Sequence, residues 1–147
     1  MLKRNSLKVK LLVLVVALAL LCFASVSTAF ASASTGTQNP DLTVSVSLTS
    51  NGVNPDQATV GNTVTLKASV TNNTKRKLSV QLTTHVAFTG GQYSLPALTV
   101  ALNPGQTLSQ TASFTVESFI PRGTYSLTLS AADKNGTSSA TGSISIV

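Results

Sequence analysis

Strict alternation of apolar and hydroxylated residues is the feature of this chain that most constrains its fold. In the run LTVSVSL, residues 42–48, every second residue is apolar and the residues between them are Thr or Ser. Successive side chains of a β-strand point to opposite faces, so such a run forms a strand with one apolar face and one hydroxylated face. Six similar runs follow, at Val64–Val70, Leu78–Phe88, Leu98–Leu102, Leu108–Val116, Tyr125–Ala131 and Ala140–Ile146.

Turn-forming residues separate these runs. They include Asn51-Gly52, Gly90-Gly91, Asn103-Pro104-Gly105, Pro121-Arg122-Gly123 and Asn135-Gly136. Short alternating strands with frequent turns predict a seven-stranded antiparallel immunoglobulin-like β-sandwich. A small closed barrel is the alternative, because periodicity does not distinguish stacked sheets from closed ones. Gly142 interrupts the last run, which predicts a bulge or a close backbone approach in an edge or frayed strand.

Residues 1–31 have the layout of a secretory signal peptide. A basic segment is followed by the apolar run Leu11–Phe23 and by the small-x-small sequence Ala29-Phe30-Ala31. The apolar run is shorter than the roughly 20 residues that cross a bilayer, which favours cleavage before Ser32 over a membrane anchor. We therefore expect a secreted or cell-surface protein with a flexible lead-in at residues 32–39 and one sandwich domain at residues 40–147. The only cysteine, Cys22, lies in the predicted leader.

The positive charge of the chain lies largely in this leader. Four of the ten basic residues fall within the first ten positions, and removing them from the net charge of +6 leaves six basic and four acidic residues, a net of +2. Such a balance argues against binding to nucleic acid, which requires a concentrated basic surface. Contact with a membrane is expected only through an uncleaved leader.

Four segments carry a resemblance to a known family. They are Asn39-Pro40-Asp41-Leu42, Gly61-Asn62-Thr63-Val64, Leu102-Asn103-Pro104-Gly105-Gln106 and Pro121-Arg122-Gly123-Thr124-Tyr125. Together they resemble the bacterial CARDB-type domains, which are immunoglobulin-like modules related to fibronectin type III domains. The resemblance implies an extracellular spacer, adhesion or accessory module.

Groups that could perform catalysis are scarce after the leader. One histidine, His85, and four carboxylates, at Asp41, Asp56, Glu117 and Asp133, are the main candidates, and none lies near another in a catalytic or calcium-binding spacing. His85 should project from the polar face of its strand. We therefore expect no enzymatic activity, no metal site and no cofactor.

Two features could contact a partner. Lys75, Arg76 and Lys77 form the only dense basic cluster after the leader, at the turn between the second and third strands. Charged turns also keep hairpins soluble, which is the alternative explanation. Tyr93 follows Gly90-Gly91 in a predicted loop, where an exposed ring could stack on a sugar or a peptide.

These observations favour a non-enzymatic exported interaction or structural module at or near the cell envelope, with an envelope polymer or an extracellular protein as its partner. The alternative is a small extracellular inhibitor of a secreted protease, which would present the loop Ser118–Gly123 and its Arg122. Tyr125 follows a Pro-x-Gly-Thr corner. It is therefore expected to act structurally as a tyrosine corner, whose hydroxyl bonds the preceding backbone.

If the leader is cleaved as predicted, the exported protein should begin at or near Ser32, because Ala29 and Ala31 present small side chains to the signal peptidase. Amino-terminal sequencing of protein from the culture medium tests this. Recovery of intact Met1 in the membrane fraction would contradict it.

Overall fold

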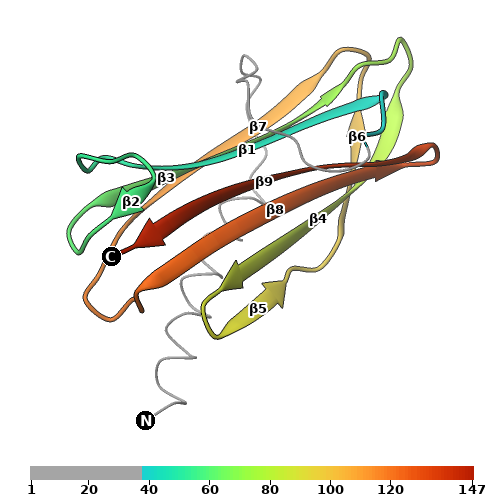
Figure 1. The fold of residues 1–147 in the computed structure, drawn as a ribbon. Coiled ribbons are helices and arrows are strands. Elements are labelled where there is room, and N and C mark those ends of the chain that lie inside the picture. Colours follow the sequence, from blue (N-terminus) through green and yellow to red (C-terminus); the bar gives the residue numbers. More distant parts are fainter. Residues whose placement is uncertain (1–37) are drawn as a thin grey trace.

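The computed structural model describes residues 38–147 as two packed β-sheets (Figure 1). The predicted signal peptide lies outside the described residues. The strands are β1 Leu42–Ser50, β2 Gln57–Ala58, β3 Thr63–Asn72, β4 Leu78–Phe88, β5 Gly91–Ser94, β6 Leu98–Leu102, β7 Thr107–Thr115, β8 Gly123–Asp133 and β9 Gly136–Ile146. All seven predicted strands are present, and β2 and β5 are two short additions. Residues 38–147 contain no helix that could span a membrane.

The two sheets stack as a sandwich, so the barrel alternative is wrong. One sheet has the order β1-β3-β7, and the other has the order β2-β9-β8-β4-β5, with β6 also paired to β4. The pairs are antiparallel except for β2 with β9, which is parallel over two residues. β5 and β6 share one side of β4: β5 lies along residues 85–88 and β6 along residues 78–82.

The apolar faces of both sheets meet in the interior, as the alternation predicts. The main cluster of buried residues comes from both sheets and includes Val44, Leu66, Val80 and Leu129. A second cluster fills one end of the sandwich around Val64, Val116 and Ile144. Burying a side chain of this kind stabilises the fold by about 1.5–3 kcal/mol relative to leaving it exposed. The two clusters together hold the sheets against each other.

Gly142 marks a close approach between β9 and β1. A Cβ atom added to Gly142 would lie 3.1 Å from Val46 Cγ1 and 3.2 Å from the backbone nitrogen of Leu48. The register with β8 continues without a bulge through the pair of Leu127 and Gly142. Of the two alternatives expected for this strand, frayed is wrong, because β9 pairs with β8 over its whole length. The edge alternative holds for most of β9, because the described strands pair with its other side only at Ser145 and Ile146, through β2.

Tyr125 makes the hydrogen bond expected of a tyrosine corner. Its hydroxyl donates to the carbonyl oxygen of Pro121 at 2.8 Å, and its half-buried ring stacks on Phe88 with the ring centroids 6.1 Å apart. Burial raises the pKa of Tyr125 above its ordinary value of 10.0, which keeps the hydroxyl protonated as a donor. The bond ties the β7–β8 connection to the first residues of β8.

Replacing Tyr125 with Phe should lower the free energy of unfolding by about 1 kcal/mol, the net contribution of one hydrogen bond. Replacing it with Ala should cost roughly 3 kcal/mol or more, because a cavity is added. Denaturant unfolding measures both effects. Tyr93→Phe is the matched control and should leave stability unchanged, because no described residue bonds its hydroxyl.

The raised pKa of Tyr125 also predicts a pH dependence. The folded state favours the protonated hydroxyl, so this stabilisation is complete below the ordinary value of 10.0 and is lost as pH rises above it. The loss between pH 9 and 11 should be smaller in Tyr125→Phe than in the parent protein. Equal losses in the two proteins would contradict this account.

Candidate functional site

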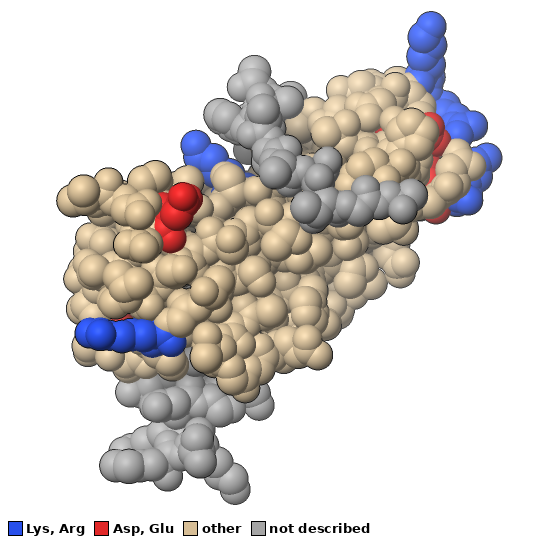
Figure 2. All heavy atoms as spheres, in the orientation of Figure 1, with Lys and Arg blue, Asp and Glu red and all other residues tan. Residues whose placement is uncertain are grey.

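The predicted basic cluster lies at one end of the sandwich, on the turn that joins β3 to β4. The side chains of Lys75, Arg76 and Lys77 are exposed there. The β8–β9 turn lies beside this turn and adds an exposed fourth cation, Lys134 (Figure 2). We call these four residues the basic end. Sequence reasoning missed Lys134 because no local pattern shows which two turns will be neighbours.

A buried amide fixes the turn that carries three of these cations. Asn72, the last residue of β3, is fully buried. Its Nδ2 donates to the carbonyl oxygens of Arg76 at 2.8 Å and of Leu102 and Asn103 at 3.1 Å each. Its Oδ1 accepts from the backbone nitrogen of Thr74 at 2.9 Å and from the Thr74 hydroxyl at 2.7 Å. Both polar atoms of the side chain are therefore satisfied, and the β3–β4 turn is tied to the β6–β7 turn.

A second buried amide fastens the start of the domain to the β8–β9 hairpin. Asn39 Nδ2 donates to Asp133 Oδ1 at 2.7 Å and to the carbonyl oxygen of Gly136 at 3.2 Å. The backbone nitrogen of Asn39 donates to Ser138 Oγ at 2.9 Å, and Asn39 Oδ1 accepts from the backbone nitrogen of Asp41 at 3.0 Å. Asn39 thus connects residues about a hundred positions apart in the chain.

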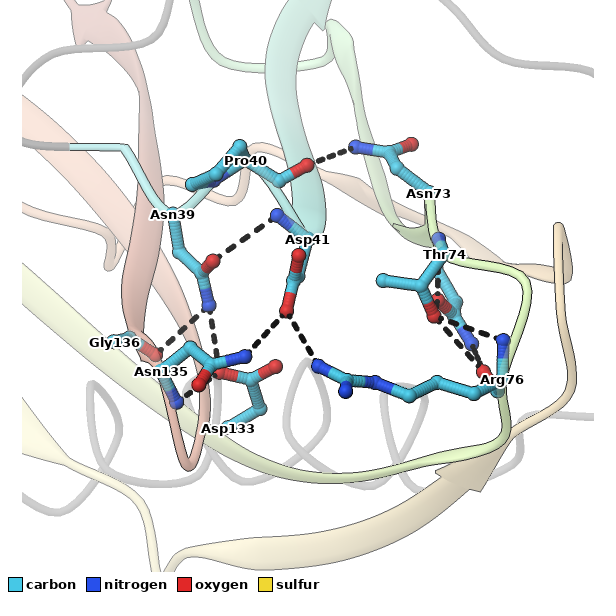
Figure 3. A network of polar contacts seen from close by, with 10 residues as sticks. Asn39, Pro40, Asp41, Asn73, Thr74, Arg76, Asp133, Asn135 and Gly136 are labelled. Atoms are coloured by element: carbon cyan, nitrogen blue, oxygen red, sulfur yellow. Dashed lines mark hydrogen bonds and ion pairs between the residues drawn. The ribbon is translucent and has the colours of Figure 1, made fainter.

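Asp41 joins the two turns of the basic end (Figure 3). Its Oδ2 accepts from Asn135 Nδ2 at 2.7 Å and from the Arg76 guanidinium at 3.3 Å. The side chains of Arg76 and Asp41 are 53% and 22% exposed, and an exposed pair of this kind contributes about 0.2–1 kcal/mol. Among residues 38–147, no carboxylate is paired with Lys75 or Lys77. These two lysines therefore remain available to an external partner.

The net charge of the described domain is concentrated at this end. The four cations of the basic end face two carboxylates, Asp41 and Asp133, which leaves +2 (4 − 2). The other two cations, Lys67 and Arg122, balance the other two carboxylates, Asp56 and Glu117. The rest of the domain is therefore neutral overall.

The fold brings Asp41 and Asp133 to the same end, although they are far apart in the sequence. One oxygen of each carboxylate accepts from a side-chain amide: Asp41 Oδ2 from Asn135 Nδ2, and Asp133 Oδ1 from Asn39 Nδ2. The other oxygen of Asp133, Oδ2, is buried without a hydrogen-bond partner among the described residues. Residues 38–147 contain no group of three or more His, Cys, Asp or Glu residues that could hold a metal ion. The two carboxylates act as acceptors that brace the turns.

Tyr93 lies in the edge strand β5 and not in the mobile loop that we expected. It pairs with Val86 of β4 and is 41% exposed. Val86 lies eight residues along β4 from Leu78, beside the basic end, which corresponds to about 27 Å. Tyr93 and the basic end are therefore separate features that one small ligand cannot contact together.

His85 projects from the outer face of β4, as expected. Its Nδ1 lies 2.8 Å from Ser94 Oγ. A histidine paired with a serine resembles part of a nucleophilic site, but such a site also needs a group that orients the histidine. No carboxylate among the described residues is bonded to His85. The pair is a cross-strand contact on the surface of the sheet.

The loop Ser118–Gly123, which a protease inhibitor would present to its target, is fastened at its centre. Ile120 is buried in the second apolar cluster, and the carbonyl oxygen of Pro121 accepts the Tyr125 hydroxyl bond. Arg122 is exposed. A loop that enters a protease cleft must project from its domain, and this loop is held down by two of its six residues.

Comparisons with known proteins agree on the family and the fold. The family described as CARDB matches residues 39–140. No protein of curated function matches the sequence. The alkylpurine DNA glycosylase of Pseudomonas fluorescens has a TM-score of 0.53 at 9% identity, and the match covers 74% of this chain but only 31% of the glycosylase.

Two solved structures of a CARDB domain from Pyrococcus furiosus are also similar. The crystal structure, in complex with di-metal ions, has a TM-score of 0.45 at 19% identity and covers 77% of this chain and 95% of that chain. The solution structure has a TM-score of 0.47 at 23% identity and covers 76% and 98%. At these identities the likeness concerns the fold alone.

Asn72→Ala should lower the free energy of unfolding by about 3 kcal/mol or more, because it leaves several buried polar groups without partners. Asn72→Asp should also destabilise the protein, since a carboxylate would face three carbonyl oxygens. Chemical denaturation measures both changes. Asn103→Ala, at an exposed neighbouring position, is the control and should stay within about 0.5 kcal/mol of the parent. Equal stability of Asn72→Ala and the control would show that the amide does not hold the turn.

Proposed function

This chain belongs to the CARDB family, and we propose that it is a non-enzymatic exported module that binds an anionic polymer of the cell envelope through its basic end. The observation that carries the proposal is the charge distribution. The whole net charge of residues 38–147 lies in one group of exposed side chains, while the rest of the domain is balanced. A partner attracted by charge would meet this end first.

The construction of the basic end supports a binding role. Turns that serve only solubility need no fixed geometry, but this turn is held by the fully buried Asn72 and by the contacts of Asp41. Holding the backbone reduces the conformational entropy lost when a partner binds. Lys75, Lys77 and Lys134 keep flexible side chains that can adjust to repeating phosphates or carboxylates.

Because the basic end is exposed to solvent, each contact that it makes is weak. Each contact between an exposed cation and an anion contributes about 1 kcal/mol or less in water. Several contacts along a repeating polymer are needed for stable attachment, and an envelope polymer offers many equivalent sites. Export, which this role requires, rests on the predicted leader at residues 1–31.

Binding to purified cell walls should therefore fall as salt rises, because the Debye length shortens from about 10 Å at 0.1 M to about 3 Å at 1 M. Cosedimentation of the exported protein across a salt series measures this. Replacing Lys75, Arg76 and Lys77 together with Gln should weaken binding at low salt by about tenfold or more. Adding Lys134→Gln should weaken it further, an effect that only the tertiary arrangement predicts.

The matched control is the double change of Lys67 and Arg122 to Gln, which lowers the net charge but leaves the basic end intact. It should bind nearly as well as the parent. Tyr93→Ala tests the competing account, in which the ring stacks on a sugar and binding is nearly indifferent to salt. Unchanged sedimentation of the triple variant, or failure of the parent to sediment, would overturn the proposal.

A further inference from the structure

The β9 strand is a long edge of the larger sheet. One side of β9 pairs with β8 from Gly136 to Ile146, but the described strands pair with its other side only at Ser145 and Ile146, through β2. Its sequence, GTSSATGSISI, contains no charged residue and no proline, which are the residues that usually guard an exposed edge. Residues 136–144 of β9 are therefore a place where a further strand can pair.

Two backbone bonds at the end of β9 show which of its groups point to this side. The nitrogen of Ser145 donates to the carbonyl oxygen of Asp56 at 3.0 Å. The nitrogen of Val147 donates in the same way to Ala58, also at 3.0 Å. Backbone groups of alternate residues in a strand point to the same side, and the register with β8 continues without interruption. The odd-numbered residues of β9 therefore direct their N–H and C=O groups away from β8.

A β-turn directs the chain before β1 back along the domain. The nitrogen of Leu42 donates to the carbonyl oxygen of Asn39 at 3.1 Å, and Pro40 occupies the second position of the turn, where proline is favoured. Side-chain bonds from Asn39 to Gly136 and Asp133 hold this turn against the β8–β9 hairpin (Figure 3). Because the turn reverses the chain, the residues before Asn39 run antiparallel to β1.

The same direction is antiparallel to β9, because β1 lies over β9 and runs parallel to it. Near the start of both strands, Ser138 Oγ donates to the carbonyl oxygen of Leu42 at 2.9 Å. Farther along both strands, a Cβ atom added to Gly142 would lie 3.2 Å from the nitrogen of Leu48. Residue numbers thus rise together along the two strands.

The contacts of Gln38 and Asn39 set the register between the chain before β1 and β9. The backbone nitrogen of Asn39 donates to Ser138 Oγ at 2.9 Å. Gln38 Nε2, one residue earlier, donates to the carbonyl oxygen of Ser139, one residue later, at 3.1 Å. One step back in the chain therefore corresponds to one step forward in β9, as in an antiparallel pair.

Continuing this register matches the predicted lead-in to the uncovered part of β9. Residues 33–37 fall opposite residues 140–144, with Gly36 opposite Thr141 and Ser34 opposite Ser143. Thr141 and Ser143 are odd-numbered, so each of these pairs can exchange two N–H···O=C bonds. Ser32 would reach Ser145, where β2 already pairs. The length of the lead-in therefore fits the gap between Gln38 and β2.

We propose that residues 33–37, which precede the described part of the chain, form an additional strand antiparallel to β9 and cover this edge of the larger sheet. Because the segment is tethered at Gln38, its effective concentration at β9 is far higher than that of a separate chain. The added strand would replace the flexible lead-in that the sequence predicts. It would also prevent β9 from pairing with other proteins.

This pairing does not depend on the binding of a polymer by the basic end. Residues 33–37 and 140–144 contain no charged side chain, so the pairing should be nearly indifferent to salt. The segment is present whether or not the leader has been removed. The two proposals can therefore fail separately.

A cross-linking experiment tests the register. In a Cys22→Ala background, Ser34→Cys combined with Ser143→Cys would place two cysteines opposite each other with Cα atoms about 5.5 Å apart, a separation that a disulfide can bridge. Ser34→Cys combined with Ser139→Cys is the matched control, because these positions would lie four residues apart, about 14 Å along the strand. Under mild oxidation we expect an intrachain disulfide in the first variant and little in the control. Equal yields in the two variants, or a disulfide between two chains, would overturn the proposal.

Hydrogen exchange of the exported protein gives the second measurement. The amide hydrogens of Thr141 and Ser143 should exchange about tenfold or more slowly in the parent than in Gly36→Pro, which removes a donor to β9. Thr35→Pro is the matched control, because the N–H of Thr35 would point away from β9, where an edge strand tolerates proline. This control should keep the protection of both amides. Equal exchange in the parent and in Gly36→Pro would show that the lead-in does not pair with β9.

Discussion

Packing of the two apolar sheet faces is the interaction on which the rest of this structure depends. Residues 38–147 contain no cysteine, so no disulfide can replace buried contacts. The side chains that meet in the interior are mostly Val, Leu, Ile and Ala, and the sheets approach closely enough at Gly142 that a methyl group would press on β1. The turns at each end can hold defined shapes only because this packing fixes the strands that carry them.

The basic end shows how the same packing creates a need for polar groups. Where strands leave the core, backbone carbonyls and amides become buried without ladder partners, and each would cost stability if left unpaired. Asn72, Asn39 and Ser138 lie at these positions and supply the missing bonds. The proposed binding surface is therefore held by residues that themselves face the interior. The backbone of a fixed turn loses less conformational entropy when a partner binds its cations than the backbone of a flexible turn does.

The outer faces of the sheets are hydroxylated and carry few charges. Cross-strand hydroxyl pairs such as Thr65 with Ser113 and Thr128 with Thr141 link neighbouring strands on these faces. Hydroxyl groups on these faces form hydrogen bonds, but they do not repel another copy of the protein as like charges would.

The sequence by itself determined the strands, the turns and the Tyr125 bond, because period-two alternation and turn chemistry are local properties. It did not predict β2 or β5, which are too short to show a period, and it placed Tyr93 in a loop. Asp41, Arg76, Lys134 and Asn135 form one end only after the β3–β4 and β8–β9 turns become neighbours. The tertiary structure alone decided this arrangement, because strand pairing across about a hundred residues follows from the packing of whole sheets and leaves no mark in any local run of residues.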